Sequence, residues 1–148
     1  KAILDGRKTQ TRRVIKDVKL PRYAAGDILW VREAWRKNEN PNSPNYGGYE
    51  YYADYEGAHC QSLIKWRSPI FMPREAARLF LKVKTVRVER LQDITAHDAT
   101  REGMESVMPF DTVDEFKELW DNLNAKRGYG WETNPWVWVY EFEKINKE

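Results

Sequence analysis

The stretch 3–13 concentrates chemically useful residue types near the start of the chain. It holds four cations, two threonine hydroxyls and a glycine, in the order Ile-Leu-Asp-Gly-Arg-Lys-Thr-Gln-Thr-Arg-Arg. Arginines hold phosphate or carboxylate groups, and a lysine can activate a neighbouring hydroxyl as a nucleophile. The alternative is that these charged residues only face solvent and have no functional role, which is common in soluble domains. The specific feature is the spacing of Gly6, Lys8, Thr11 and Arg13.

Local structure decides whether Lys8 and Thr11 can act together. Gly6 is expected to end the tail of a helix over 1–5 in the left-handed conformation, after which the chain enters a strand. The strand is favoured by β-branched residues, namely Thr9, Thr11, Val14 and Ile15. On an ideal strand, Lys8 and Thr11 would point to opposite faces. They converge only if Lys8 still belongs to the turn after Gly6, or if a bulge intervenes.

Short strands dominate the rest of the pattern. They are expected at 28–31 with a continuation through 35, at 49–55, at 79–91 and at 136–142. Within 79–91, apolar residues move from odd to even positions, which predicts a bulge or bend near 84–85. The last strand is apolar on both faces and is expected to be central in its sheet. Four tryptophans are assigned to the core, where large rings bury much area: Trp35, Trp120, Trp136 and Trp138.

Two helices are expected before the last strand. The segment 95–98 has the pattern of a capping box and predicts a short helix that ends at Gly103. Glu102 then falls in its last turn, where a carboxylate opposes the helix dipole unless a cation or a task compensates. A second capping box, starting at Thr112, precedes an amphipathic helix. Strands with helices on their connections predict an α+β fold for a single domain over 1–148, as a small, partly open β-barrel.

Composition and charge exclude several classes of partner. The 148 residues are 41% hydrophobic and 32% charged, and no apolar run approaches the roughly 20 residues of a membrane span, so no membrane partner is expected. The net charge of +2 does not indicate a general attraction to polyanions. Basic residues nevertheless gather at 7–22 and at 82–90, where two neighbouring strands could form a patch for phosphate. Solvated strand edges are the alternative interpretation.

Cysteine and histidine are scarce. The single Cys60 excludes an internal disulfide and fits a reducing, cytoplasmic setting. His59, Cys60 and His97 are too few and too irregularly spaced for a zinc site. We therefore expect no metal and no other cofactor.

Four segments, in this order, resemble the ASCH domains, a branch of the PUA-like barrel superfamily. They are 3–13, a helix end followed by glycine, lysine and a polar strand; 25–31, a strand; 93–104, a helix that bears an acidic residue; and 137–142, a closing strand. Together they reach nearly the whole length of the chain. The similarity is greatest to phage or prophage ASCH proteins and to the small bacterial N-acetylcytidine amidohydrolases. The resemblance implies a small PUA-like β-barrel.

The resemblance also implies a catalytic lysine, threonine and glutamate, which fall here on Lys8, Thr11 and Glu102. Many ASCH domains carry a glutamate where this chain has Thr11, and the threonine favours the amidohydrolase-like subset. Amide hydrolysis needs a nucleophile, a base and a group that holds the developing oxyanion. We expect Thr11 as the nucleophile, Lys8 as its activator and Glu102 as the acid–base group that returns a proton to the leaving amine.

Two functions remain open at this level. The first is an amidohydrolase that deacetylates an acylated pyrimidine nucleoside such as N-acetylcytidine. The second is a noncatalytic module that binds RNA or a modified nucleobase, a role that suits basic strands with exposed aromatics. An enzyme for free nucleosides needs an enclosed pocket around Lys8, Thr11 and Glu102. A noncatalytic RNA-binding module, which we call a reader, needs an extended basic groove. The candidate substrate-binding residues are Arg7, Arg13, Trp30 and Arg74, for which a place in the core or on the surface is the alternative.

Overall fold

The structure is a computed structural model that describes residues 1–17, 20–108 and 111–146. The chain forms two compact units. The first unit comprises Lys1–Leu29 and Leu81–Ile145, and the second is formed mainly by Trp30–Phe80. The second unit is thus one excursion of the chain between two segments of the first. The single domain expected over 1–148 stays a prediction, because compact units of this size can belong to one domain or to two.

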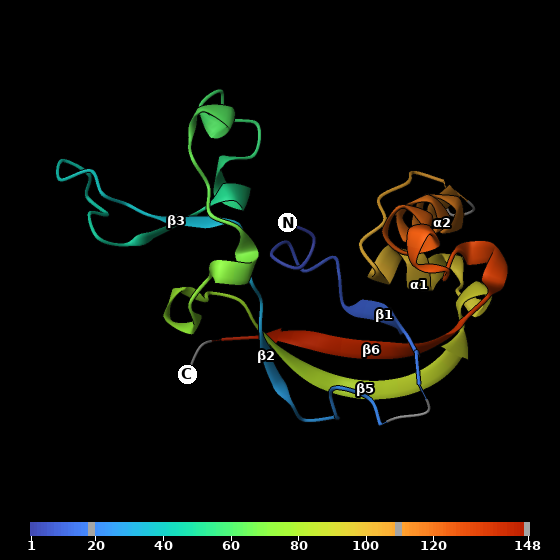
Figure 1. The fold of residues 1–148 in the computed structure, drawn as a ribbon. Coiled ribbons are helices and arrows are strands. Elements are labelled where there is room, and N and C mark those ends of the chain that lie inside the picture. The colour runs from blue at the N-terminus through green and yellow to red at the C-terminus, as the bar shows by residue number, and fades with distance from the viewer. Residues whose placement is uncertain (18–19, 109–110, 147–148) are drawn as a thin grey trace. The chain divides into compact units, whose positions relative to one another are not determined.

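Four strands form a curled antiparallel sheet. They are β1 (Gln10–Val14), β2 (Ile28–Trp30), β5 (Phe80–Arg90) and β6 (Trp136–Ile145). Their order is β1-β6-β5-β2 (Figure 1), which makes β6 a central strand as its two apolar faces predict. Val137 and Val139 of β6 are completely buried. The predicted α+β class is confirmed, with a sheet that curls as half of a barrel.

Strand β5 runs unbroken from Phe80 to Arg90, and Lys84 and Thr85 are both exposed, so alternation is interrupted at the predicted position. The bulge or bend itself stays a prediction. The prediction assumed that Val88 faces the core, but this side chain is 48% exposed. The inward-facing partners in this half of the strand are Arg87 and Glu89, which form ion pairs. Hydrophobic alternation is a poor guide here because the partly buried positions carry charged side chains, with Arg87 34% and Glu89 24% exposed in an ion pair.

Two helices lie over one end of this sheet (Figure 1). Helix α1 (Ala96–Arg101) begins with the predicted capping box, in which the Thr95 hydroxyl and the Asp98 carboxylate each accept from the other's backbone N–H. Helix α2 (Asp111–Asn124) begins one residue before Thr112, so the prediction of Thr112 as its cap is wrong. The core between sheet and helices consists of Leu91, Ile94, Ala99, Phe116, Trp120, Val137 and Val139.

The N-terminal segment consists of hydrogen-bonded turns where the tail of a helix is predicted. Gly6 has φ +78°, the left-handed conformation that its position predicts. The backbone N–H groups of Arg7 and Lys8 both donate to the carbonyl of Ala2, at 2.9 and 3.1 Å. Lys8 therefore belongs to the turn and precedes β1, which satisfies one of the two conditions for its convergence with Thr11.

The second unit is built on a short hairpin of β3 (Trp35–Lys37) and β4 (Tyr49–Tyr51). The predicted continuation of the strand over 32–34 is wrong, because these residues form no strand. The predicted strand 49–55 is half right, because Tyr52–Tyr55 forms a 3₁₀ turn. Three further 3₁₀ turns follow, at Gln61–Leu63, Pro69–Phe71 and Arg74–Ala76.

The tryptophans divide between core and surface. Trp35 and Trp120 are buried as predicted. Trp136 is 49% exposed, so its assignment to the core is wrong; it begins β6, and the guanidinium of Arg90 lies 4.2 Å from its ring centroid. Trp138 is half-buried. Within the part of the chain that the structure describes, no helix is long and apolar enough to cross a membrane.

Candidate active site

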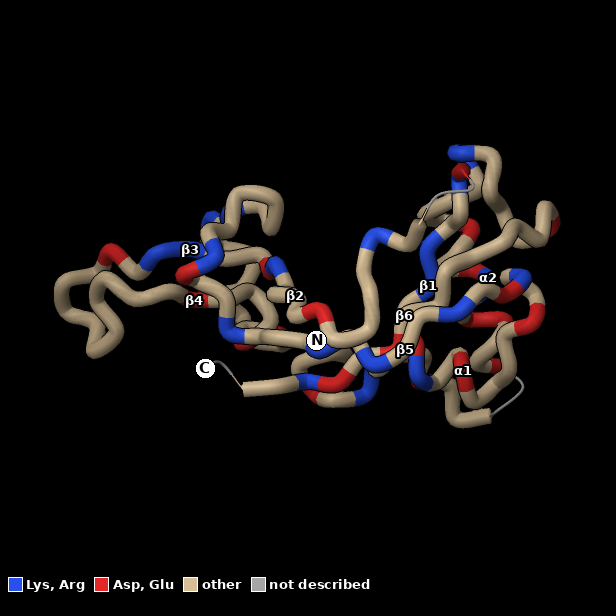
Figure 2. The backbone as a smooth tube through the Cα atoms, turned by 90° about the horizontal axis from the view of Figure 1, so that it is seen from below, with Lys and Arg blue, Asp and Glu red and all other residues tan. Residues whose placement is uncertain are grey.

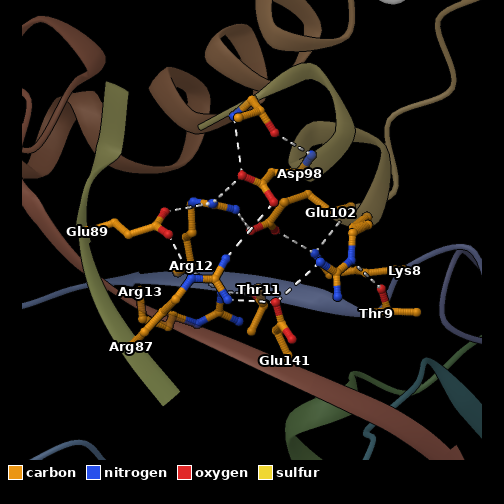
Figure 3. Close-up of polar contacts among 12 residues, drawn as sticks. Lys8, Thr9, Thr11, Arg12, Arg13, Arg87, Glu89, Asp98, Glu102 and Glu141 are labelled. Atoms are coloured by element: carbon orange, nitrogen blue, oxygen red, sulfur yellow. Dashed lines mark hydrogen bonds and ion pairs between the residues drawn. The ribbon is translucent and has the colours of Figure 1, made fainter. Parts of the chain in front are cut away.

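Lys8 and Glu102 meet although 94 positions separate them in the sequence. Nζ of Lys8 lies 3.0 Å from Oε2 of Glu102 and donates a second hydrogen bond to the Glu102 backbone carbonyl at 2.9 Å (Figure 3). That carbonyl is available because Glu102 caps the C-terminus of α1, where the last carbonyls have no partner within the helix. Lys8 is thus a cation that compensates a carboxylate at the unfavourable end of the helix dipole.

Arg12 holds the other oxygen of the same carboxylate. Its Nη1 lies 2.9 Å from Oε1 of Glu102, and its Nη2 lies 3.2 Å from Glu89 and 3.5 Å from Asp98. The Arg12 side chain is completely buried, and that of Glu102 is 4% exposed. With one cation on each oxygen, the orientation of the Glu102 carboxylate is fixed.

A wider set of ion pairs surrounds Arg12. Arg87 contacts Glu89 at 2.7 Å and Glu141 at 2.6 Å, and Arg101 contacts Glu141 at 3.2 Å. We call this set the Arg12 network; its members are Lys8, Arg12, Arg87, Arg101, Glu89, Asp98, Glu102 and Glu141. Figure 2 marks basic residues along β1 and acidic residues on α1, both in the first unit. Equal numbers of cations and carboxylates balance the charge around Arg12 and Glu102, which are buried, while the other members are partly exposed.

Two carboxylates of the network are held in the charged form. Burial alone would raise the pKa of Asp98, but hydrogen bonds from Thr95 and the charges of Arg12 and Arg87 outweigh it and lower the pKa. Burial likewise opposes ionisation of Glu141, and the hydrogen bond from Arg87 with the charge of Arg101 lowers its pKa nevertheless. Asp98 and Glu141 are therefore carboxylates around neutral pH.

Thr11 lies on β1, opposite Tyr140 of β6. Its hydroxyl oxygen accepts a hydrogen bond from Nη1 of Arg13 at 2.7 Å. A guanidinium group can only donate, so the hydrogen of the Thr11 hydroxyl remains available for another acceptor. Arg13 itself is exposed, and its Nη1 also donates to the Arg12 carbonyl at 2.8 Å.

Lys8, Thr11 and Glu102 line one pocket of about 520 Å³. The charged side chains around them are Arg12, Arg13, Lys16, Arg22 and Arg127. The apolar and aromatic wall is formed by Val14, Phe116, Leu119, Trp120, Leu123 and Tyr129. Leu119 and Leu123 are 42% and 62% exposed on α2, so part of this wall is open to a ligand. All of the lining comes from the first unit. We call this cavity the active-site pocket.

Comparisons with protein-family models, curated proteins and solved structures found no match. The resemblance to ASCH domains therefore stays a prediction, and function has to be derived from the site. Within the described residues, no group of three or more His, Cys, Asp or Glu side chains is arranged to hold a metal ion.

The candidate binding residues fall in different places. Arg13 lines the pocket. Arg7 is engaged elsewhere, since its guanidinium lies 2.5 Å from Glu105 and 3.3 Å from the carbonyl of Gly103. Trp30, whose ring has the Arg32 guanidinium 5.0 Å from its centroid, and the exposed Arg74 belong to the second unit. A binding role for Trp30 and Arg74 stays a prediction.

Arg12 is the site residue that sequence reasoning missed. Its position on β1 nevertheless carried a usable signal. On a strand, Arg12 shares a face with Gln10, and that face is buried in the structure. A buried arginine requires carboxylate partners, which could have linked Arg12 to the acidic segment around 98–102.

Proposed function

We propose that the protein is an ASCH-like amidohydrolase that removes the acyl group from an acylated pyrimidine nucleoside such as N-acetylcytidine. The observation that carries the proposal is the shared pocket of Lys8, Thr11 and Glu102, with Lys8 and Glu102 in direct contact at 3.0 Å. A nucleophile, a base and an acid are the groups that amide hydrolysis requires. A cytoplasmic setting belongs to the same proposal.

The Lys8–Glu102 contact offers a route for the proton. The ammonium group of Lys8 passes a proton to Glu102, and the neutral amine then takes the proton of the Thr11 hydroxyl. The Thr11 oxygen attacks the amide carbonyl and forms a bond to its carbon, which gives a tetrahedral oxyanion. The guanidinium of Arg13 already donates to the Thr11 oxygen, and together with the restored ammonium group of Lys8 it would stabilise that charge.

The acyl group then leaves in two steps. The bond between the carbonyl carbon and the exocyclic nitrogen breaks as Glu102 returns its proton to that nitrogen, which releases cytidine. For the second step Lys8 again passes its proton to Glu102, and the neutral amine takes a proton from the water that attacks the acyl ester. The bond between the carbonyl carbon and the Thr11 oxygen then breaks as Glu102 returns its proton to that oxygen, which gives the free hydroxyl and acetic acid, which ionises to acetate. Arg12 takes no part in bond making and acts as a positioning residue that keeps Glu102 oriented towards Lys8.

The pocket suits the remaining parts of such a substrate. Its volume of about 520 Å³ lies within the roughly 300–1,000 Å³ range of small-molecule sites. The exposed faces of Leu119 and Leu123, with Tyr129, provide an apolar wall for a flat base.

The test is to incubate the purified protein with N-acetylcytidine and to measure cytidine and acetate by chromatography. We expect turnover by the unaltered protein and its loss in Lys8→Ala. Lys84→Ala is the matched control, because Lys84 is 57% exposed and pairs only loosely with Glu143, at 4.0 Å. Absence of turnover in the unaltered protein would contradict the proposal.

A noncatalytic reader of nucleic acid is the second candidate. It is favoured by the cations at the pocket wall, where Arg13, Lys16, Arg22 and Arg127 provide more positive charge than a neutral nucleoside needs. A reader would bind oligonucleotides with a strong dependence on salt and would leave N-acetylcytidine intact.

A further inference from the structure

A second cavity of about 400 Å³ shares a wall with the active-site pocket. Arg13, Val14, Lys16 and Arg22 line both cavities. The walls that belong to the second cavity alone include Tyr23, Trp138 and Tyr140. All of these residues belong to the first unit. The proposed deacetylation of a free nucleoside does not require the second cavity.

The second cavity offers aromatic surface held in place. The rings of Tyr23 and Tyr140 meet edge to face, with centroids 5.5 Å apart, and Tyr140 is buried. Trp138 lies on the central strand β6 and is half-buried, so part of its ring faces the cavity. Rigid aromatic side chains of this kind stack nucleobases without regard to their identity.

The wall shared by the two cavities is basic. It contributes three exposed cations, Arg13, Lys16 and Arg22, with Asp17 as the acidic residue of the second cavity. Cations in such a place bind the phosphate that joins two nucleosides and so set the register of the chain. The order of features is thus a reactive pocket, a phosphate-binding wall and an aromatic pocket.

We infer that the second cavity is a subsite for the nucleotide adjoining the acylated one. The substrate is then a short single-stranded oligonucleotide, of which a dinucleotide is the minimum. The acylated pyrimidine enters the active-site pocket, the phosphodiester lies on the shared wall, and the neighbouring base stacks on Trp138 and Tyr23. This inference rests on the proposed function for the chemistry, and on the second cavity alone for the subsite.

The test compares kcat/KM for N-acetylcytidine, its 5′-monophosphate, and dinucleotides in which it is linked to adenosine in either order, as ribose and deoxyribose forms. We expect one dinucleotide to exceed the nucleoside and the monophosphate by about tenfold or more, because base stacking adds to binding. Replacement of its phosphodiester by a neutral methylphosphonate should remove part of the gain, since the shared wall then has no charge to bind.

Substitutions on β6 test whether Trp138 provides the increase in kcat/KM of the dinucleotide over the nucleoside. Trp138→Ala should lower the ratio of dinucleotide to nucleoside towards one, and Trp138→Phe should keep most of the ratio because it keeps a ring. Trp136→Ala is the matched control, two residues away on the same strand and outside the lining of both cavities. It should leave the ratio unchanged.

Equal kcat/KM values for the dinucleotides and the monophosphate would overturn the inference and leave the proposed function intact. An equal fall in the ratio of dinucleotide to nucleoside kcat/KM in Trp136→Ala and Trp138→Ala would also overturn the inference. If no acylated substrate is hydrolysed, the proposed function fails and binding decides the subsite. Calorimetry with unacylated cytidine–adenosine dinucleotide would then support the inference if binding is lost in Trp138→Ala but not in Trp136→Ala, and would overturn it otherwise.

Discussion

Arg12 in the first compact unit and Arg78 in the second are each held by carboxylates, and the two clusters differ in what lies beyond them. In the first unit, Arg12 is completely buried and one of its carboxylate partners is Glu102. In the second unit, Arg78 forms a bidentate pair with Glu33 at 2.8 and 2.9 Å and donates to Asp54 at 2.8 Å. The residue types and the distances are nearly the same.

We call Arg78, Glu33 and Asp54 the Arg78 cluster. This cluster packs against an aromatic ring, whereas the Arg12 network borders a cavity. The guanidinium of Arg78 lies 4.0 Å from the ring centroid of Tyr51, and hydrogen bonds with Glu33 raise the pKa of Arg78 further above its ordinary value. The carboxylate held by Arg12 instead contacts Lys8, and both line the active-site pocket. The two clusters are alike in composition and differ in what lies at their edge, and on the proposed function only the Arg12 network takes part in the reaction.

The largest effect is expected from removal of the two central arginines. Arg12→Met leaves three carboxylates without their buried partner and should lower the free energy of unfolding by about 3–5 kcal/mol. Arg78→Met should cost less, about 1–2 kcal/mol, because the Asp54 side chain is 45% exposed and can be solvated. Urea unfolding measures both. An equal or larger loss in Arg78→Met would contradict the distinction between the two clusters.

The next effect concerns turnover. Glu102→Gln keeps the shape of the side chain but removes its acid–base function, so hydrolysis of N-acetylcytidine should fall by about 10²- to 10⁴-fold. Glu33→Gln makes the same chemical change in the Arg78 cluster and should leave hydrolysis unchanged. Steady-state kinetics on folded samples of both variants provides the comparison. Loss of turnover in both would indicate a general structural effect.

A smaller effect is expected from two glycines with positive φ. Gly103 has φ +104°, and an added Cβ would lie 3.1 Å from Cβ of Ala2 and 3.5 Å from Cβ of Lys8. Gly57 of the second unit has φ +80° and open space around the same position. Gly57→Ala should cost about 1 kcal/mol from backbone strain alone. Gly103→Ala should cost more, because Ala2 has to shift. It should also reduce turnover, because the carbonyl of Ala2 accepts a hydrogen bond from the backbone N–H of Lys8 and its shift moves Lys8. An equal loss of unfolding free energy in the two variants, with unchanged turnover in Gly103→Ala, would show that the packing of Gly103 does not hold Lys8 in place.

The smallest effect is a difference in pH dependence between the units. The lowered pKa values of Asp98 and Glu141 stabilise the first unit above their ordinary values of 3.8 and 4.5, and this stability is lost as pH falls through the lowered values. In the second unit, the hydrogen bond to Glu75 raises the pKa of Tyr49 and burial raises that of Tyr51, so their contribution is lost above pH 10.

Hydrogen exchange measured by mass spectrometry resolves the two units. We expect protection to decrease first in the first unit on acidification and first in the second unit at alkaline pH. Glu141→Gln should flatten the acid response of the first unit. An unchanged response in that variant would show that the ion pairs of Glu141 do not stabilise the fold.

The sequence predicted those parts of the fold that depend on local rules. The stop at Gly6, the capping box before α1 and the central position of β6 follow from backbone conformation, side-chain caps and apolar alternation. Alternation failed along β5, where Arg87 and Glu89 occupy inward positions, and at Trp136, where a large ring lies against Arg90 at the start of a strand. Both failures occur where a charged partner changes the environment of a side chain.

The candidate site was predicted in part. The unfavourable place of Glu102 at the end of a helix indicated a missing cation, and Lys8 supplies it. The role of Arg12 was missed although its strand face indicated a need for carboxylate partners; which carboxylates these are depends on contacts 77 to 90 positions away, with β5 and with α1 and its C-cap. Contacts of that range are fixed by the sheet, in which β5 and β1 flank the central strand β6.

A double-mutant cycle on Lys8 and Glu102 tests the central claim most directly, that these two side chains act as one catalytic pair. The measurement is kcat/KM for N-acetylcytidine in the unaltered protein, Lys8→Met, Glu102→Gln and the double variant. Because residues that act as a unit are strongly non-additive, the double variant should be no slower than the slower single variant. Losses that multiply, or the absence of hydrolysis in the unaltered protein, would contradict the pair.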